Sequence, residues 1–234
     1  MTKRLLAVPF STVLMLLAAC ETQQRADLAT NSTIYEGRPY LAREPGDRAI
    51  YVLPVADGRK AVEPAAGQDG FPVAYDGDAR WDRPVDTMVA EVLQRELIDS
   101  GVFNRLLDEP DRCELILRPT LTSFVTGAME VDTGGRSLAE IGLRIEIFGP
   151  QEASGQRPLL HDQVYGDRQM SSPALLPPSP YLMAGRALRM TMAQALAALD
   201  KNGLARSTPS PLAPERLQQL GIPAQPAAPA APAK

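Results

Sequence analysis

Two stretches of the chain carry hydrophobic residues with a helical period. In the first, apolar side chains occupy positions i, i+3, i+4, i+7, i+8 and i+12 of an amphipathic helix: Val85, Met88, Val89, Val92, Leu93 and Leu97. Pro84 suits the first turn of this helix, and Gly101 suits the position just after its last turn. The second stretch, "YLMAGRALRMTMAQALAALDKNG", places Leu188, Met192, Leu196 and Leu199 along one side and ends at Gly203. We therefore predict two helices.

Elsewhere the pattern is that of β-strands. Apolar Ile141, Leu143, Ile145 and Ile147 alternate with Glu140, Gly142, Arg144 and Glu146, which predicts an antiparallel strand with one solvated face. Runs rich in β-branched and aromatic residues predict further strands at Ala49–Val55, Val102–Leu107, Cys113–Gly127 and Leu159–Met170. Pro119 implies a sheet edge or a bulge, and the pair Gly134-Gly135 predicts a hairpin turn.

The order of these elements is strand, helix, strand, three-stranded meander, helix. It predicts an α+β fold over residues 48–203, a two-layer sandwich with a mostly antiparallel sheet and two helices on one face. Residues 20–47 are polar without a sustained period and predict a flexible tether of roughly 30 Å, although Ile34–Leu41 could add an edge strand. A loop is expected over Lys60–Ala79. Residues 204–234, with seven prolines after Ser207, predict a Pro/Ala-rich disordered tail.

The first residues have the pattern of a cleaved targeting segment. Lys3 and Arg4 precede an apolar run that ends at Ala19 and is shorter than the ~20 residues of a spanning helix. Leu17-Ala18-Ala19-Cys20 resembles a bacterial lipobox, so we expect residues 1–19 to be a lipoprotein signal peptide. Cys20 would then be acylated, with palmitate among the acyl chains, and would bind the membrane through its lipid. Glu21 in place of Asp resembles the outer-membrane address of Gram-negative lipoproteins.

Composition and charge narrow the function classes. The formal charge of −4 becomes −6 without Lys3 and Arg4, which argues against a nucleic-acid partner. The single histidine, His161, is expected on a solvated strand face, and with Cys113 as the one cysteine after Cys20, the chain offers too few ligands for a Cys/His metal centre. Cys113 is interpreted as a core residue, and "DTGG" at Asp132 as turn chemistry. We predict no enzyme activity, no catalytic residues, no cofactor and no metal.

One corner of the sequence has the residue types of a recognition site. Trp81, the only tryptophan, lies between Arg80 and Arg83 just before the first predicted helix. Its ring could pack under that helix. Alternatively, Arg80, Trp81 and Arg83 could contact a partner.

The stretch "RWDRPVDTMVAEVLQRELIDSGVFNRLL" and the later "AEIGLRIEIF" resemble the PqiC-like auxiliary lipoproteins of ABC-type transport systems. The similarity runs from about Ala49 to Leu199; the Lys60–Ala79 loop and the Pro/Ala-rich tail depart from the family pattern. The resemblance implies an outer-membrane lipoprotein that faces the periplasm. It would be a non-enzymatic accessory subunit of an ABC/MCE-type lipid transport complex, with protein partners there and an apolar or lipid ligand.

A second function fits the same residues. Small α/β lipoproteins of the CsgG and LpoB group share a similar strand and helix order. The chain could therefore be an adaptor that regulates a cell-wall synthase, or could contribute to an envelope assembly or secretion complex. The predicted linkers at both ends favour the adaptor, because it must reach across the periplasm.

Overall fold

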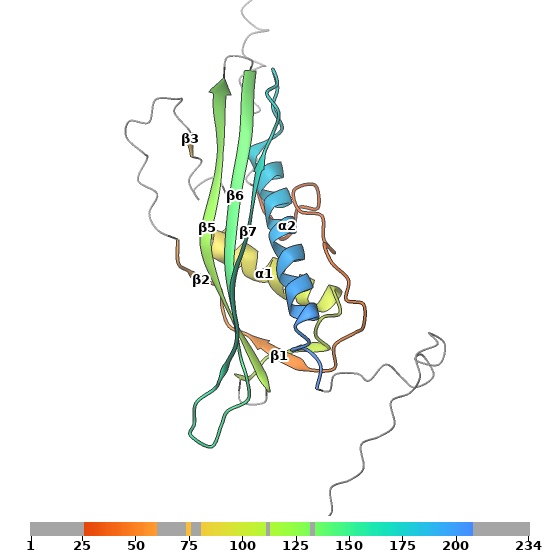
Figure 1. Ribbon diagram of the computed structural model, residues 1–234. Coiled ribbons are helices and arrows are strands. Elements are labelled where there is room, and N and C mark those ends of the chain that lie inside the picture. The colour runs from red at the N-terminus through yellow and green to blue at the C-terminus, as the bar shows by residue number, and fades with distance from the viewer. Residues whose placement is uncertain (1–25, 60–73, 76–80, 111–112, 132–133, 208–234) are drawn as a thin grey trace, which may run out of the picture.

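The computed structural model describes residues 26–59, 74–75, 81–110, 113–131 and 134–207. Within these ranges it has an α+β fold of two helices and one sheet, as the sequence predicts (Figure 1). In chain order the elements are β1 (Ala49–Val52), β2 (Ala56–Asp57), β3 (Ala74–Tyr75), α1 (Val85–Asp99), β4 (Arg105–Leu107), β5 (Leu115–Val131), β6 (Gly134–Phe148), β7 (Leu159–Met170) and α2 (Pro180–Lys201).

The sheet is mixed. Its strand order is β4-β1-β5-β6-β7, and β2 and β3 pair with β5 beside this path. The short strand β1 runs parallel to both β4 and β5, whereas the long strands β5, β6 and β7 are antiparallel and form the predicted meander. The first predicted strand is shorter than expected, since β1 ends at Val52, and β3 lies inside the predicted Lys60–Ala79 loop.

The proline of β5 lies where the pairing of this strand changes. On one side, β1 pairs with β5 as far as Leu117 and β2 pairs from Thr120. On the other side, the register with β6 shifts between Leu121 and Ser123. Pro119 therefore sits between two short partner strands and just before the bulge, which agrees with its predicted role.

The β5–β6 turn is displaced from its predicted position. Val131 pairs with Gly134, so the connection consists of residues 132–133, and both glycines belong to β6. Instead of forming the turn, Gly134 lets the backbone at Ala174 approach closely, because a Cβ on Gly134 would lie 2.7 Å from the carbonyl oxygen of Ala174. Asp132 falls outside the described residues.

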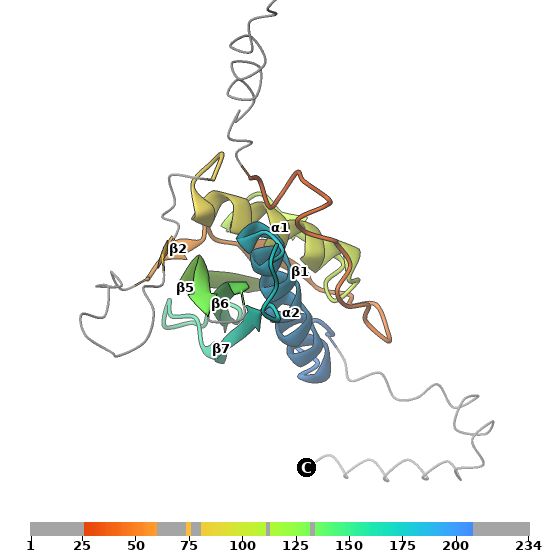
Figure 2. The ribbon, with the colours of Figure 1, turned by 90° about the horizontal axis from the view of Figure 1, so that it is seen from above.

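Both helices pack on the face of the sheet that carries the isoleucines of β6 (Figure 2). α1 buries its predicted stripe, and Gly101 follows it with φ +67°. α2 buries Leu188, Met192, Leu196 and Leu199, and Gly203 follows it with φ +66°. The two helical periods thus predict both the helices and the buried faces, because a single apolar stripe faces the core.

Residues 26–48 are not a tether. This segment, which we call the N-terminal strap, runs as turns and coil across the helices, and no strand forms at Ile34–Leu41. Leu28 is 1% exposed and Tyr35 2%, and both belong to the hydrophobic core. The prediction failed because these two side chains insert into the core singly, without the period that marks a helix or strand.

The folded body also ends later than predicted. The carbonyl oxygen of Ala205 accepts the N–H groups of Asp47 and Arg48 at 3.0 and 3.1 Å, and Ala205 itself is buried. The body therefore extends to Ser207, four residues past the predicted boundary at 203. Cys20 and the predicted signal peptide, as well as residues 208–234 of the predicted tail, lie outside the described residues.

Candidate functional site

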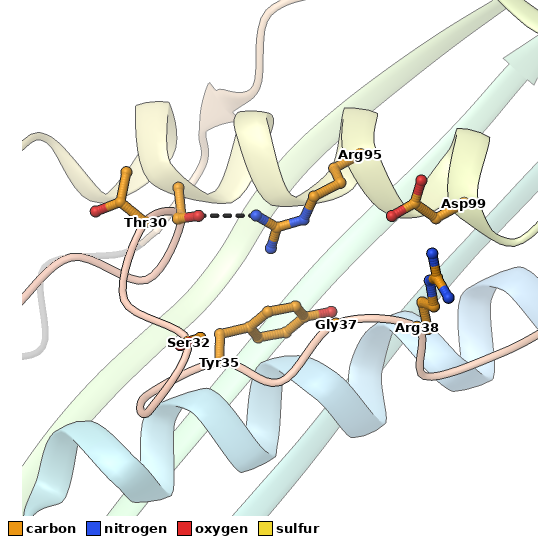
Figure 3. Close-up of a pocket in the computed structure, with 8 residues that line it drawn as sticks. Thr30, Ser32, Tyr35, Gly37, Arg38, Arg95 and Asp99 are labelled. Carbon is orange, nitrogen blue, oxygen red and sulfur yellow. Dashed lines mark hydrogen bonds between the residues drawn. The ribbon is translucent and has the colours of Figure 1, made fainter.

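A polar pocket of about 310 Å³ lies between the N-terminal strap and α1. Figure 3 shows the strap passing between the two helices, with Arg95 reaching from α1 toward the Tyr35 ring. The described lining residues come from these two elements: Ala29, Thr30, Ser32, Tyr35, Gly37, Arg38, Arg95 and Asp99.

A buried carboxylate, Glu96, contacts the strap next to this pocket. Glu96 is 0% exposed, and its Oε2 accepts the backbone N–H of Arg38 at 2.9 Å. Its Oε1 and the Tyr35 hydroxyl are both buried without a partner in normal hydrogen-bond geometry. Burial raises the pKa of Glu96, against the lowering effect of the Arg38 N–H. Burial, followed by the charge of Glu96, raises the pKa of Tyr35. Of all the charged groups on α1, Glu96 thus has the environment that most opposes its charge.

Arg95 ties the strap to α1. Its Nη1 donates to the carbonyl oxygen of Ala29 at 2.8 Å, and its guanidinium carbon lies 5.5 Å from the centroid of the Tyr35 ring, within cation–π range. Arg38 adopts φ 59°, a conformation that non-glycine residues rarely adopt. Its side chain points toward Asp99 in Figure 3.

The charged residues that line the pocket are Arg38, Arg95 and Asp99, and Arg95 Nε lies 3.7 Å from Oε1 of the buried Glu96. We interpret the residues around this pocket as the contacts that hold the strap on α1. Among the described residues, no group of three or more His, Cys, Asp and Glu side chains gathers as metal ligands.

The residues of the predicted recognition site, Arg80, Trp81 and Arg83, do not form one exposed surface among the described residues. Trp81 is 3% exposed and makes edge-to-face contacts with Phe124 and Tyr181, at centroid distances of 5.5 and 4.9 Å. The interpretation that its ring packs in the core is therefore correct, and the ring offers almost no surface to a partner. Arg80 lies outside the described residues.

Arg83 instead holds the start of the strap. Its Nε lies 2.9 Å from Asp27 Oδ2, and its Nη2 lies 2.9 Å from Glu91 Oε2. Burial raises the pKa of Asp27, but hydrogen bonds from Arg83 and from the N–H groups of Ala29 and Thr30 outweigh it, and the pKa falls. Arg83 is thus engaged on two sides within the fold.

His161 is buried, contrary to the prediction of a solvated strand position. It pairs with Ile147 and so faces the helices; its Nε2 lies 3.0 Å from the Tyr165 hydroxyl and its Nδ1 3.2 Å from Asn202 Nδ2. Burial lowers its pKa. The prediction failed because β7 is an edge strand on which only every fourth side chain, His161 and then Tyr165, reaches the core. Cys113 is buried, as predicted.

The other face of the sheet carries a row of ion pairs across the three long strands. Arg118 on β5 contacts Glu146 on β6 at 2.6 Å, and Arg144 on β6 contacts Asp162 on β7 at 2.6 Å. Hydrogen bonds from Arg118 lower the pKa of Glu146. The polar residues of β6 thus share one face as predicted, but Glu146 is only 5% exposed, so this face is less solvated than expected.

Sequence reasoning missed the strap contacts, although one signal was present. Glu96 falls on the buried stripe of α1, directly before Leu97 and three residues after Leu93. A carboxylate at a core position of an amphipathic helix implies a polar partner from another segment. Tyr35 and Arg38 gave no comparable signal.

No helix within the described part of the chain is both long and apolar enough to cross a membrane. No protein-family model and no curated protein matches the chain. Its structure is similar to that of a Xanthomonas campestris protein assigned to the DUF330 family, with TM-score 0.43, 12% identity, and coverage of 72% of this chain and 92% of that one. It is also similar to a hypothetical protein of Chlamydia trachomatis, with TM-score 0.39, 12% identity, and coverage of 65% and 98%. Neither neighbour is described with an activity.

Proposed function

We propose that this chain is a lipid-anchored periplasmic lipoprotein of the outer membrane, a non-enzymatic accessory subunit of an ABC/MCE-type lipid transport complex. The proposed anchor is supported by the lipobox-like sequence that ends at Cys20. Cys20 lies only six residues before Ala26, the first described residue of the strap, which forms a bridge with Trp81. Six residue steps span at most about 20 Å. An acylated Cys20 would therefore hold the body close to the bilayer.

The closeness of the body to the membrane supports a transport subunit over a far-reaching adaptor. The adaptor drew its support from long linkers at both ends, but residues 26–47 pack on the helices instead of forming a tether. The transport role itself is supported by the resemblance of residues 80–107 to PqiC-like lipoproteins.

The anchor is tested by metabolic labelling with palmitate and by fractionation of membranes. The wild-type chain should carry label and sediment with outer membranes, and Cys20→Ser should carry none and be released by washing. Label on the Cys20→Ser chain, or none on wild type, would contradict the anchor.

The partner is tested by crosslinking the full-length lipoprotein in its native membranes and identifying captured proteins by mass spectrometry. Enrichment of a permease, an ATPase or an MCE-domain protein, lost in the Cys20→Ser control, is the expected result. Enrichment of a cell-wall synthase without any transport component would contradict the proposal and favour the adaptor.

A further inference from the structure

Two leucines between β7 and α2 project almost completely into solvent. Leu175 is 93% exposed and Leu176 87%, more than any other large hydrophobic side chain among the described residues. Scattered exposed leucines are common on protein surfaces, but an adjacent pair at this exposure creates a contiguous apolar patch.

The backbone holds this pair in place. Ala174, just before it, exchanges both backbone hydrogen bonds with Gly135, at 2.9 and 3.0 Å. Gly135 packs closely against the Pro177 ring, where a Cβ would come within 3.1 Å. After the prolines, the Ser179 side chain accepts the N–H of Tyr181 at the start of α2. The exposed leucines therefore sit on a braced loop, which we call the leucine loop (residues 174–179).

The leucine loop lies at the same end of the body as the start of the strap. Ala26 forms a bridge with Trp81, whose ring lies 4.9 Å from that of Tyr181. Tyr181 is the second residue of α2, which begins at Pro180 directly after the leucine loop. Figure 1 shows this connection beside the tip of the β5–β6 hairpin.

From this placement we propose that Leu175 and Leu176 insert into the surface of a lipid bilayer and orient the body on the membrane. The inference rests on the proposed anchor at Cys20. The six residue steps from Cys20 to Ala26 span at most about 20 Å. Strand β5 alone, with 17 residues, is roughly 55 Å long. If the long strands stand perpendicular to the membrane, the body can therefore touch the bilayer only with the end that carries Ala26 and the leucine loop.

The surroundings of the loop suit a membrane interface. Met170, at the end of β7, is 44% exposed, and Arg136 Nη1 lies 3.6 Å from its sulfur. A guanidinium beside exposed apolar side chains can contact headgroup phosphates while the apolar groups enter the acyl region. Two leucines also add to a lipid anchor the second signal that keeps an attachment oriented.

The test uses the full-length, processed lipoprotein, reconstituted alone into vesicles of phosphatidylethanolamine and phosphatidylglycerol. A Leu176→Cys variant in a Cys113→Ser background is labelled with the fluorophore NBD. The control is Leu160→Cys, also an exposed leucine, at the start of β7 and thus at the opposite end of the sheet. We expect a blue-shifted emission at position 176 and quenching by nitroxide-labelled lipids at least about twofold stronger than at position 160.

Equal quenching at the two positions would overturn the proposal. A blue shift at position 176 that depends on protein density and shows no lipid quenching would also overturn it, because the leucine loop would then contact a second copy of the chain. Since the vesicles contain no other protein, these outcomes are independent of whether a transport partner exists. A chain that carries no acyl group and fails to reconstitute would contradict the proposed anchor instead.

Discussion

Gly185 of α2 is the position where the N-terminal strap should be most sensitive to substitution. A Cβ on Gly185 would lie 1.7 Å from the carbonyl oxygen of Ile34 and 2.6 Å from its carbonyl carbon. The strap backbone thus lies directly on the helix, and Gly185→Ala forces the two apart. In an isolated helix the same change would be favourable, because Ala has a higher helix propensity than Gly.

The two effects have different sizes. The gain in helix propensity is about 1 kcal/mol. To restore a contact of 3.0 Å, the Ile34 carbonyl would have to move by roughly 1.3 Å, and overpacking of this kind costs about 1–3 kcal/mol. If the strap lifts off instead, Leu28 and Tyr35 leave the core, and each buried side chain of this size contributes about 1.5–3 kcal/mol. Once the gain in helix propensity is subtracted from the cost of overpacking, we expect Gly185→Ala to lower the free energy of unfolding by up to about 2 kcal/mol.

Urea unfolding followed by circular dichroism measures the total effect, and hydrogen exchange with mass spectrometry locates it. Amides of residues 28–40 should exchange faster in Gly185→Ala. Gly155→Ala is the control: Gly155 has φ +82°, and the nearest atom to a methyl group there would be Gln151 Nε2 at 3.8 Å. This control should cost about 1–2 kcal/mol without changing exchange in the strap. A Gly185→Ala protein that is more stable than wild type, with unchanged exchange at residues 28–40, would refute the packing of strap on helix.

Three further predictions concern charged groups of the fold. Burial raises the pKa of Glu96, so the folded state disfavours the charged carboxylate. The resulting loss of stability grows as the pH rises above the ordinary pKa of this carboxyl. Glu96→Gln should therefore stabilise the protein more at pH 8 than at pH 4, as measured by urea unfolding. Burial lowers the pKa of His161, so its contribution is present above its ordinary pKa of 6.5 and is lost as pH falls; His161→Phe should reduce the loss of stability between about pH 7.5 and 5. Arg83→Ala should lower the free energy of unfolding by about 1 kcal/mol and speed exchange near Asp27, whereas Arg59→Ala, outside the strap, should leave exchange there unchanged.

The regular elements could be predicted because their hydrophobic pattern has a period. The stripe of α1 and the alternation in β6 are each caused by a single buried face, and the structure buries those faces. The sheet edge or bulge predicted at Pro119 rested instead on the missing N–H of proline, and the register shifts between Leu121 and Ser123. Periodic burial is a local property of the chain, so local sequence is sufficient to detect it.

The strap could not be predicted in this way, because its contacts are single and distant. Tyr35 enters the core between two helices that are far from it in sequence, and Asp27 meets Arg83 at a separation of 56 residues. The same holds for His161, whose Nδ1 lies 3.2 Å from Nδ2 of Asn202, 41 residues further along the chain. A polar segment with isolated apolar residues is typical of a linker until its partners are known.

The strap also extends along the whole length of α2. It begins beside the first turn of α2 and ends near Ala205, which follows the last turn. The 22 residues of α2 span about 33 Å. If Cys20 and the leucine loop hold the first end at the bilayer, as proposed, Ala205 and the last turn of α2 lie about 33 Å further out. The strap, which contacts the body at both ends of α2, would then fix the distance between the bilayer and that far end of the body.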